Sequence, residues 1–343
     1  MKILILIIKV LRKFLKSIGK KEKKAISIIN YLSWKERSDN FDLNFDFEEI
    51  KKDKDYFKKK NLWPSKIAAC IAFSYKEERL IHIKEICKNL EMIDKNIDLT
   101  IVVNDLGFSK KDFIEKEINS ICSLKIEFFN PKDLLDPRLL PLSHFEIVKK
   151  KFNQKEYSHF LYLEDDILIK ELNIKYWVIA RASLKKYNLI PSFVRTEINE
   201  KDKERYVVDT IKKNSFLLQS KILNKNKSFA FLNLVNFYCG SYFYDRELMS
   251  EHLNGPSCSL DFGHGSYNQK YIIPDMQELG LLERASAVLA FKDVPKGFLH
   301  RNMVPVNVIT KQLEEYCLIE HLSNKFANTK SDFGKIKVKD VFK

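Results

Sequence analysis

Near its middle the chain reads Tyr157-Ser-His-Phe-Leu-Tyr-Leu-Glu-Asp-Asp-Ile167, an apolar run that stops at three adjacent carboxylates. Residues 160–163 predict a buried strand that ends at the acids of residues 164–166. Neighbouring carboxylates repel one another and resist desolvation unless a cation is held beside them. Open α/β sheets bind ligands at the carboxyl ends of their strands, and hard divalent cations prefer oxygen ligands and bridge to phosphates. We therefore expect a metal site here; the alternative is a strand end with solvated acids.

The sequence on either side of this acidic triplet alternates short apolar runs with amphipathic segments. Predicted strands cover 67–74, 99–103, 124–129 and 160–163, and predicted helices cover 77–90, 108–121 and 139–152. This order is typical of an α/β fold with an open, mostly parallel sheet and helices on both faces. Beyond it the pattern is weaker: we expect a helix over 177–187, an aromatic strand-like run over 231–244 and a helix over 245–253.

The pattern divides the chain into three parts. Residues 1–64 are a basic, amphipathic N-terminal extension, residues 65–310 form the α/β domain, and residues 311–343 form a basic C-terminal tail. We expect the part of this tail beyond Glu320 to be poorly ordered.

Composition indicates a globular enzyme. The chain has 343 residues, and its 45% hydrophobic content is enough for a large core and excludes general disorder. The net charge of +14 favours anionic partners such as nucleotides, phospholipid surfaces or nucleic acid, although much of the lysine is dispersed as it would be on a solvated surface. The six cysteines form no CxxC pair, which fits buried thiols in a reducing, cytoplasmic compartment.

The first 24 residues have a distinct character. They contain nine Lys or Arg residues against the single acid Glu22, with apolar residues at helical spacing. A basic amphipathic helix can lie in an anionic membrane interface. We expect peripheral contact with the inner face of the cytoplasmic membrane, the alternative being that this segment docks on the protein itself.

Several nucleotide-binding and hydrolytic motifs are absent from the sequence. It has no GxGxxG after the first predicted strand, no GxxxxGK[ST] loop, no HExxH and no GxSxG. With nine glycines, the chain cannot easily cradle phosphate on backbone amides alone. If it binds a nucleotide, a metal and side chains must neutralise the phosphates.

This combination resembles the GT-A class of nucleotide-sugar glycosyltransferases. Residues 160–167 resemble the aspartate motif of that class, with adjacent acids in place of D-x-D. The resemblance implies that Asp166 is a metal ligand, that Asp165 is a second or water-mediated ligand, and that Glu164 contacts the donor. The metal would be manganese or magnesium. The resemblance covers residues 66–170 and extends more weakly to about 305, which makes 65–170 the donor-binding half and 171–310 the acceptor half.

Residues at the ends of the first two predicted strands are candidates for donor contacts. Tyr75 can stack on the base, and Lys76 or Arg79 can meet phosphate. Asn104 and Asp105 follow the second strand, where the class contacts base or ribose. The alternatives are a tyrosine that packs at the rim and an Asn-Asp pair that only forms a turn.

Later candidates come from the C-terminal half. By the resemblance, His300 is a further metal ligand, and Arg301 can meet the diphosphate. Three acids, which the sequence does not rank, are candidates for the catalytic base: Asp275, Glu278 and Glu283.

Two further features of the sequence allow two interpretations each. Arg195 and Glu197 form either a structural pair or a substrate clamp, and Gly240 indicates either close approach to a sugar or a bulge. His144 is a weaker candidate for a donor-side contact. The glycines around His264 suggest a lid.

These observations predict a metal-dependent glycosyltransferase that moves a sugar from a nucleotide-sugar donor to a surface glycan or lipid-linked acceptor. One alternative is a nucleotidyltransferase, but such enzymes usually carry a glycine-rich basic loop where this chain has Ser74-Tyr-Lys-Glu-Glu78. The other is a non-enzymatic basic protein that binds membranes or nucleic acid. Its lysines would cluster with aromatics on one module, whereas here they are dispersed outside 1–24 and 51–60. We expect no nucleic-acid partner.

Overall fold

The computed structural model describes residues 46–104, 107–131, 134, 137–209, 221–223, 229–233, 238–255, 286–295, 298, 300–307 and 309–341. Some of the predictions concern residues outside these ranges. They are the N-terminal amphipathic helix, Asp105, the lid around His264, and the candidate bases Asp275, Glu278 and Glu283.

The main sheet has five strands in the order β11-β4-β1-β2-β3. Its strands are β1 (Ile67–Phe73), β2 (Ile97–Val103), β3 (Lys125–Phe129), β4 (His159–Glu164) and β11 (Ser241–Asp245). The first four are parallel, and β11 runs antiparallel to β4. All seven residues of β1 are buried, and Ala72 near its end lies opposite both Val102 and Glu164. The carboxyl ends of β1, β2 and β4 therefore meet at one edge.

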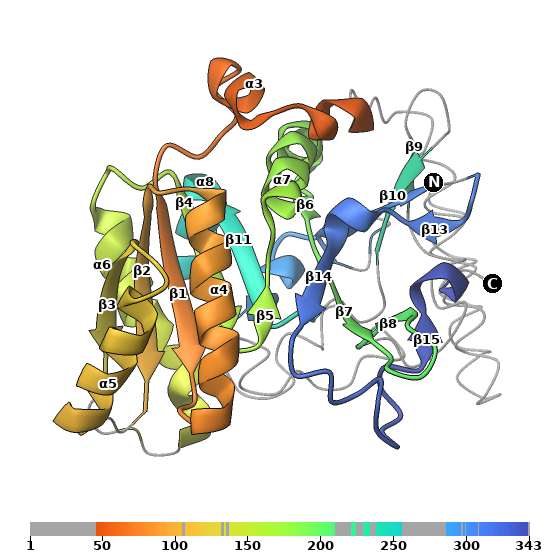
Figure 1. Cartoon of the computed structure of the whole chain (residues 1–343). Coiled ribbons are helices and arrows are strands. Elements are labelled where there is room, and N and C mark those ends of the chain that lie inside the picture. Colours follow the sequence, from red (N-terminus) through yellow and green to blue (C-terminus); the bar gives the residue numbers. More distant parts are fainter. Residues whose placement is uncertain are drawn as a thin grey trace, which may run out of the picture.

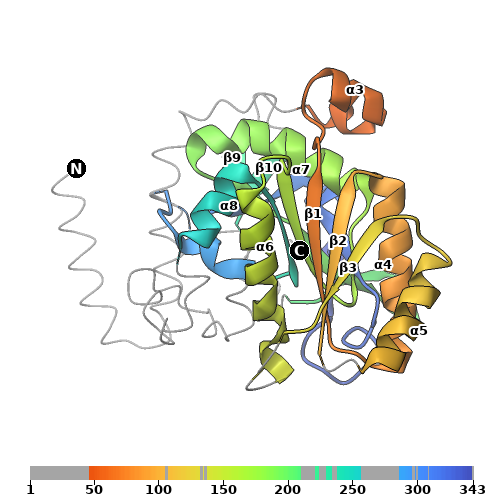
Figure 2. The same cartoon turned by 90° about the vertical axis from the view of Figure 1, so that its left-hand side faces the viewer.

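Helices cover both faces of this sheet, as expected for the predicted α/β fold. Figure 2 shows α4 (Leu80–Ile93) and α5 (Phe108–Asn119) on one face, and α6 (His144–Asn153) and α8 (Arg246–Leu253) on the other. In α4 the buried side chains recur at three- and four-residue spacing from Leu80 to Ile93, which gives the helix one apolar face. The 3-10 helices η4 (Glu77–Arg79) and η5 (Pro137–Ser143) precede α4 and α6.

Two smaller sheets pack beside the main one (Figure 1). One has the order β13-β12-β10-β9, with β6 paired to β12, and the other has the order β15-β8-β7-β14-β5. The strands of the first are β6 (Ile190–Pro191), β9 (Lys221–Leu223), β10 (Phe229–Leu232), β12 (Asn302–Asn307) and β13 (Gln312–Leu313). Those of the second are β5 (Ile167–Leu168), β7 (Val194–Ile198), β8 (Arg205–Val207), β14 (Leu318–His321) and β15 (Ile336–Lys337). The predicted aromatic run 231–244 thus contributes to two separate strands, β10 and β11.

Helix α7 (Glu171–Leu184) lies between the main sheet and the smaller sheets (Figure 1). Most of its side chains are buried, including Trp177, Tyr176 and Ile179, as expected for a helix that is packed on all sides. The 3-10 helix η6 (Lys185–Tyr187) follows directly and ends at Asn188, whose backbone adopts the left-handed conformation. The predicted helix 177–187 is thus the second part of a longer helical segment.

Residues beyond Glu320 are folded, so the expectation of a poorly ordered segment there is wrong. Strand β14 pairs with β7 and β5, and β15 pairs with β8. The 3-10 helix η9 (Glu315–Cys317) precedes β14, and η10 (Val338–Asp340) leads to Val341, which is fully buried. The sequence pattern missed this because the strands are only two to four residues long.

Residues 46–64 are also part of the folded body. The 3-10 helix η3 (Phe47–Lys51) and α3 (Lys54–Lys59) begin at Asp46 and Asp53, whose carboxylates accept backbone N–H groups of the first turn. Ile50, Phe57 and Trp63 are buried in the core. Figure 1 shows α3 beyond the end of the main sheet opposite to the one where β1 finishes.

Two further observations bear on compartment and membrane. The described cysteines, Cys70, Cys87, Cys122, Cys239 and Cys317, are buried free thiols. Among the residues that the structure places, no helix has the length and apolar character needed to cross a bilayer. The η8 segment (Val288–Phe291) is short and buried.

His144 lies in the core between α6 and the main sheet. Its side chain is fully buried, and its ring stacks on Tyr162 at 4.2 Å between centroids. Ring atom Nδ1 hydrogen-bonds to the Pro141 carbonyl, whereas Nε2 has no partner within the described part of the chain. Burial lowers the pKa of His144 to about 4. This position makes His144 a core residue.

Replacement of His144 by Phe tests this burial. The folded-state pKa lies below the unfolded value, so the stability contribution is complete above about pH 6.5 and is lost as pH falls toward 4. In urea unfolding, we expect the loss of stability between pH 7 and pH 5 to shrink by about 2 kcal/mol in His144→Phe. An unchanged pH dependence would show that His144 is protonated normally in the folded protein.

Candidate active site

The acidic triplet forms the junction between two sheets. Glu164 ends β4 in the main sheet, Asp165 and Asp166 form the turn, and Ile167 starts β5 in the sheet that contains β14. The side chains of Asp165 and Asp166 are each only 6% exposed, compared with 25% for Glu164. Two buried acids at a turn require partners, and each of the three acids has a different set.

Asp165 faces the end of β1. Its Oδ2 accepts the backbone N–H of Ser74 at 3.1 Å, and Nη1 of Arg79 donates to both carboxylate oxygens at 3.1 and 2.9 Å. Burial and the charge of Asp166 raise the pKa of Asp165 to about 6, against the opposing effect of Arg79. Asp165 is thus committed to Arg79 here, and direct metal ligation would require it to leave that pair.

The other predicted donor contacts lie along the same edge. The backbone N–H of Tyr75 donates to Asn104 Oδ1 at 2.9 Å, which ties the loop after β1 to the end of β2. The ring of Tyr75 is partly buried, meets Phe73 edge-to-face at 5.7 Å, and has Lys110 Nζ 5.6 Å from its centroid. Lys76, the next residue, is exposed. The structure therefore brings Tyr75, Asn104, Arg79 and Asp165 into one connected edge.

Asp166 faces a histidine that sequence reasoning missed. Nε2 of His321 lies 3.0 Å from Asp166 Oδ2, and Nδ1 of the same ring bonds to Oε1 of Glu197. The side chains of His321 and Glu197 are completely buried. Strand β14 brings His321 here because it pairs with β5 on one side and with β7 on the other.

The electrostatics of this group follow from its pairing. Burial opposes the charge on Asp166, but the hydrogen bond and charge of His321 outweigh it and lower the pKa of Asp166. Burial likewise opposes the charge on His321, but hydrogen bonds to Asp166 and Glu197 raise its pKa. Lys325 Nζ lies 3.9 Å from Asp166 Oδ2. Asp166 is thus paired with one histidine and lies near one lysine.

Glu164 has a third environment. The Tyr238 hydroxyl donates to its Oε1, and Nη1 of Arg195 lies 3.8 Å from its Oε2. Arg195 also donates to both oxygens of Asp209, at 3.0 and 2.6 Å. Arg195 and Glu197 are two residues apart on β7, so their side chains lie on the same face of the strand. Arg195 contacts Glu164, whereas Glu197 contacts His321, the partner of Asp166.

His300 and Arg301 are not brought to the triplet. His300 is fully buried, its Nδ1 accepts the backbone N–H of Asn302 at 3.1 Å, and Asn233 donates to its carbonyl at 2.9 Å. Arg301 is 1% exposed, and its Nη1 donates to Glu251 at 2.5 Å. Both side chains are used to hold β12 against its neighbours.

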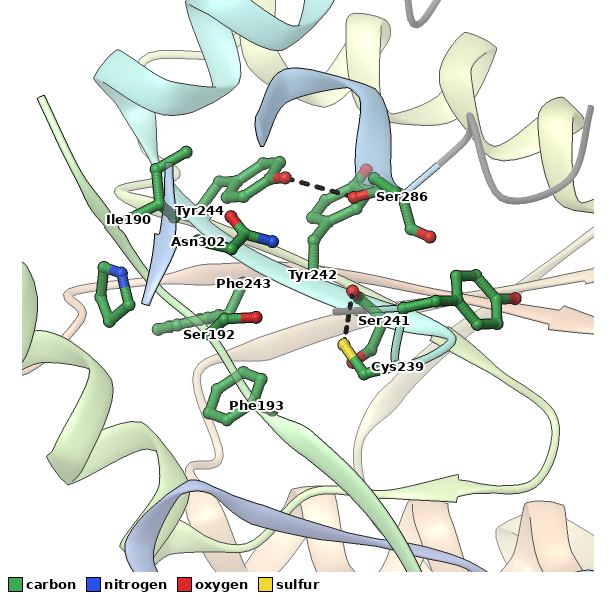
Figure 3. Close-up of a pocket in the computed structure, with 13 residues that line it drawn as sticks. Ile190, Ser192, Phe193, Cys239, Ser241, Tyr242, Phe243, Tyr244, Ser286 and Asn302 are labelled. Atoms are coloured by element: carbon green, nitrogen blue, oxygen red, sulfur yellow. Dashed lines mark hydrogen bonds between the residues drawn. The ribbon is translucent and has the colours of Figure 1, made fainter. Parts of the chain in front are cut away.

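A small pocket lies between β6, β11 and β12 (Figure 3), and one of its lining residues, Tyr238, hydrogen-bonds to Glu164. Its lining is uncharged and includes Ser192, Tyr238, Tyr242 and Asn302. Asn302 Oδ1 is buried there and has no partner among the described residues. The cavity measures about 20 Å³, room for about one water molecule rather than a sugar ring.

The residues at Asp166 fit a divalent metal as an incomplete site. Within the described residues, no three His, Cys, Asp or Glu side chains are arranged to hold a metal ion. Asp166 and His321 offer one oxygen and one nitrogen, and Glu197 stands behind the imidazole as carboxylates do behind metal-ligating histidines. Magnesium-type ions are often bound by one or two side chains, with water and substrate phosphates completing the shell. Asp166 and His321 alone therefore provide two ligands, and the remaining ligands of such a site would have to come from water or a bound substrate.

A weak signal for His321 was present in the sequence. Leu318-Ile-Glu-His321 begins with two apolar residues and ends with a charged residue and a histidine. It is a shorter version of the pattern at β4, where an apolar run ends in the acidic triplet. Glu197 likewise follows a buried run. Neither pattern separates a site residue from a surface one without the strand pairing.

Comparison with known proteins does not assign a family. No protein-family model matches the sequence, and no curated protein matches it. Among solved structures, S. aureus TarS matches with 11% identity and a TM-score of 0.33, over 55% of this chain and 29% of TarS. The mannosyltransferase PcManGT from Pyrobaculum calidifontis, in complex with GDP-Man and Mn²⁺, matches with 9% identity and a TM-score of 0.32, over 51% of this chain and 45% of that one.

A third similar structure belongs to a different class of enzyme. 4-Diphosphocytidyl-2C-methyl-D-erythritol synthase from Anaerococcus prevotii matches with 12% identity and a TM-score of 0.30, over 62% of this chain and 86% of the synthase. The chain spans less than half of the length of TarS and of the mannosyltransferase. At these scores the similarities carry no argument about activity.

Gly240 provides a test of how the triplet is packed. It adopts φ +63°, and a Cβ there would lie 2.8 Å from Glu164 Oε2. We expect Gly240→Ala to lower the free energy of unfolding by about 2–4 kcal/mol, through backbone strain and overpacking. The measurement is urea denaturation.

Gly107 offers the matched control for this substitution. It has φ −62°, and a Cβ there would meet nothing within 4 Å. We expect Gly107→Ala to change stability by less than about 1 kcal/mol. Equal effects at the two positions would contradict the close approach of Gly240 to Glu164.

Proposed function

We propose that this protein is a metal-dependent glycosyltransferase that moves a sugar from a nucleotide-sugar donor to a saccharide or lipid-linked acceptor. The observation that carries the proposal is the pairing of Asp166 with His321 at the carboxyl edge of a parallel sheet, beside Asp165 and Arg79. This edge is where open α/β sheets bind ligands. Oxygen and imidazole ligands next to a fixed guanidinium suit a metal-bound diphosphate.

The donor would lie along the ends of β1, β2 and β4. In this proposal Tyr75 and Asn104 contact the base or ribose, and Lys76 and Arg79 contact the phosphates. The bond from Tyr75 N–H to Asn104 and the pairing of Arg79 with Asp165 support it, because they gather these residues at one edge. A divalent ion of the manganese or magnesium type, when bound, stabilises the charge that develops on the departing diphosphate. Asp166 and His321 would hold it, and Asp165 would support it through water or after release from Arg79.

Glu164 is placed to contact the donor sugar. It is the most exposed of the three acids. Tyr238 contacts one of its carboxylate oxygens and Arg195 the other. Burial raises the pKa of Glu164 against the opposing charge of Arg195. A carboxylate fixed at both oxygens is suited to orient sugar hydroxyls. Asp275, Glu278 and Glu283 remain the candidates for the base that activates an acceptor hydroxyl.

A membrane contact at the inner face of the cytoplasmic membrane is a separate part of the proposal. The support comes from the basic residues of 1–24 and from the lysines of 51–60, several of which are exposed on η3 and α3. Anionic lipid attracts such clusters. Of these segments, α3 lies at the end of the main sheet opposite to the one where β1 finishes (Figure 1).

Donor turnover tests the proposal. With Mn²⁺ and a panel of UDP-, GDP- and CMP-sugars, we expect slow metal-dependent hydrolysis of one donor, which EDTA abolishes. Asp166→Asn should lower this rate at least about 100-fold, because it removes a charged ligand at the position where the diphosphate is neutralised. Release of the free nucleotide, which is UDP, GDP or CMP according to the donor, is the measurement.

Glu156→Gln is the control, since its side chain is 53% exposed at the opposite end of the sheet. It should leave hydrolysis unchanged. Turnover of nucleoside triphosphates with release of pyrophosphate would instead favour a nucleotidyltransferase. Absence of both turnover and metal-dependent nucleotide binding would contradict the enzyme class altogether.

Substitutions can distinguish the roles of His321 and His300. We expect His321→Gln to abolish Mn²⁺-dependent donor binding, because it removes the imidazole next to Asp166. His300→Gln should leave Mn²⁺ affinity within about threefold of wild type and lower the melting temperature, as for a buried packing residue. Isothermal titration with Mn²⁺ and differential scanning calorimetry measure the two effects. The reverse pattern would make His300 the ligand.

A further inference from the structure

Glu197 is a charged side chain without solvent contact, and both of its oxygens are used. Oε1 bonds to Nδ1 of His321, and Oε2 accepts the backbone N–H groups of Phe326 at 2.8 Å and Ala327 at 2.5 Å. Its side chain is 0% exposed. Such a group is costly unless fully bonded, as it is here.

These bonds determine which ring nitrogen of His321 carries a proton and which one faces Asp166. A carboxylate is only an acceptor, so Nδ1 of His321 must carry a proton. When the imidazole is neutral, Nε2 is therefore the bare nitrogen, and it points at Asp166 Oδ2 from 3.0 Å. The ring of Phe326 stacks on His321 at 5.6 Å and 18°, which fixes the plane of the imidazole as well.

We propose that Glu197 is a positioning residue for the metal site: it fixes the tautomer and orientation of His321 so that Nε2 is available as a ligand beside Asp166. The inference rests on the proposed metal-dependent function. Outer carboxylates of this kind contribute about 10- to 100-fold to metal affinity. Glu197 never contacts the donor in this assignment and acts only through His321.

Glu197→Gln tests this proposal because the amide that replaces the carboxylate would donate a hydrogen bond to His321 instead of accepting one. The two backbone N–H groups of Phe326 and Ala327 require an oxygen, so the amide NH₂ must face Nδ1 of His321. That amide donates, which forces the proton of His321 onto Nε2 and aims an N–H at the metal position. We expect Mn²⁺ affinity, measured by EPR of free Mn²⁺ with the intact protein and no nucleotide, to fall about 10- to 100-fold.

Asn199→Ala is the matched control for a purely structural role. Asn199 Nδ2 donates to the Ala327 carbonyl at 2.7 Å, so it anchors the same loop from the residue just beyond β7 without touching His321. We expect its Mn²⁺ affinity to stay within about threefold of wild type, the scatter of a surface substitution. Equal losses in the two variants, or no loss in Glu197→Gln, overturn the positioning role. A wild-type protein that binds no Mn²⁺ overturns the proposed function itself, and this is recognisable because no substitution is involved.

A measurement on the wild-type protein covers the case in which Glu197→Gln does not fold. With Zn²⁺ as a diamagnetic probe, ¹⁵N-histidine NMR reports which ring nitrogen carries the proton, and His321→Gln assigns the signal. We expect Nδ1–H for His321 with Nε2 bound to the metal. A metal-bound protein in which His321 carries its proton on Nε2 contradicts the proposal.

Discussion

The constraint on which this structure depends is the charge of three consecutive carboxylates at the end of a buried strand. Neighbouring acids at low exposure cannot remain ionised without counter-charges. The fold supplies a different cation to each: Arg79 to Asp165, His321 to Asp166 and Arg195 to Glu164. These three come from the helix after β1, from β14 and from β7. The positions of the elements around the triplet follow from this requirement.

That requirement also explains why the main sheet and the second small sheet are joined at the triplet. Strand β4 pairs with β1, whereas β5, two residues later, pairs with β14. The backbone contributes too, since Leu322 N donates to the Asp166 carbonyl at 2.8 Å and Glu164 N to the Gly240 carbonyl at 2.9 Å. A turn that changes sheets within two residues holds its side chains rigidly, because backbone pairing fixes both of its ends. Rigid placement is what a binding site for a charged ligand needs.

The sequence predicted the parallel part of the main sheet and missed His321, the partner of Asp166. Strands β1, β2 and β4 could be predicted because their apolar runs are almost wholly buried, and the segments between them have helical spacing; β3 is only partly buried at one edge of the sheet. The location of Asp165 near Arg79, and of Tyr75 near Asn104, follows from the parallel strands alone. His321 could not be found in the same way. Its strand has four residues, and its place beside Asp166 depends on pairing across more than 150 residues, which local pattern does not contain. His300 was the candidate from sequence because the resemblance implies a C-terminal histidine at the metal, and because Arg301 beside it could meet the diphosphate.

The balance of charge at the site is itself informative. Around the triplet the carboxylates of Glu164, Asp165, Asp166, Glu197 and Asp209 face the permanently cationic side chains of Arg79, Arg195 and Lys325. With the acids ionised and His321 neutral, two negative charges remain uncompensated among these groups. A proton on His321 compensates one of them, whereas a divalent cation compensates both. Burial raises the pKa of Asp165 to about 6 and also raises that of Glu164, so a proton on either acid is a further way to compensate the excess negative charge.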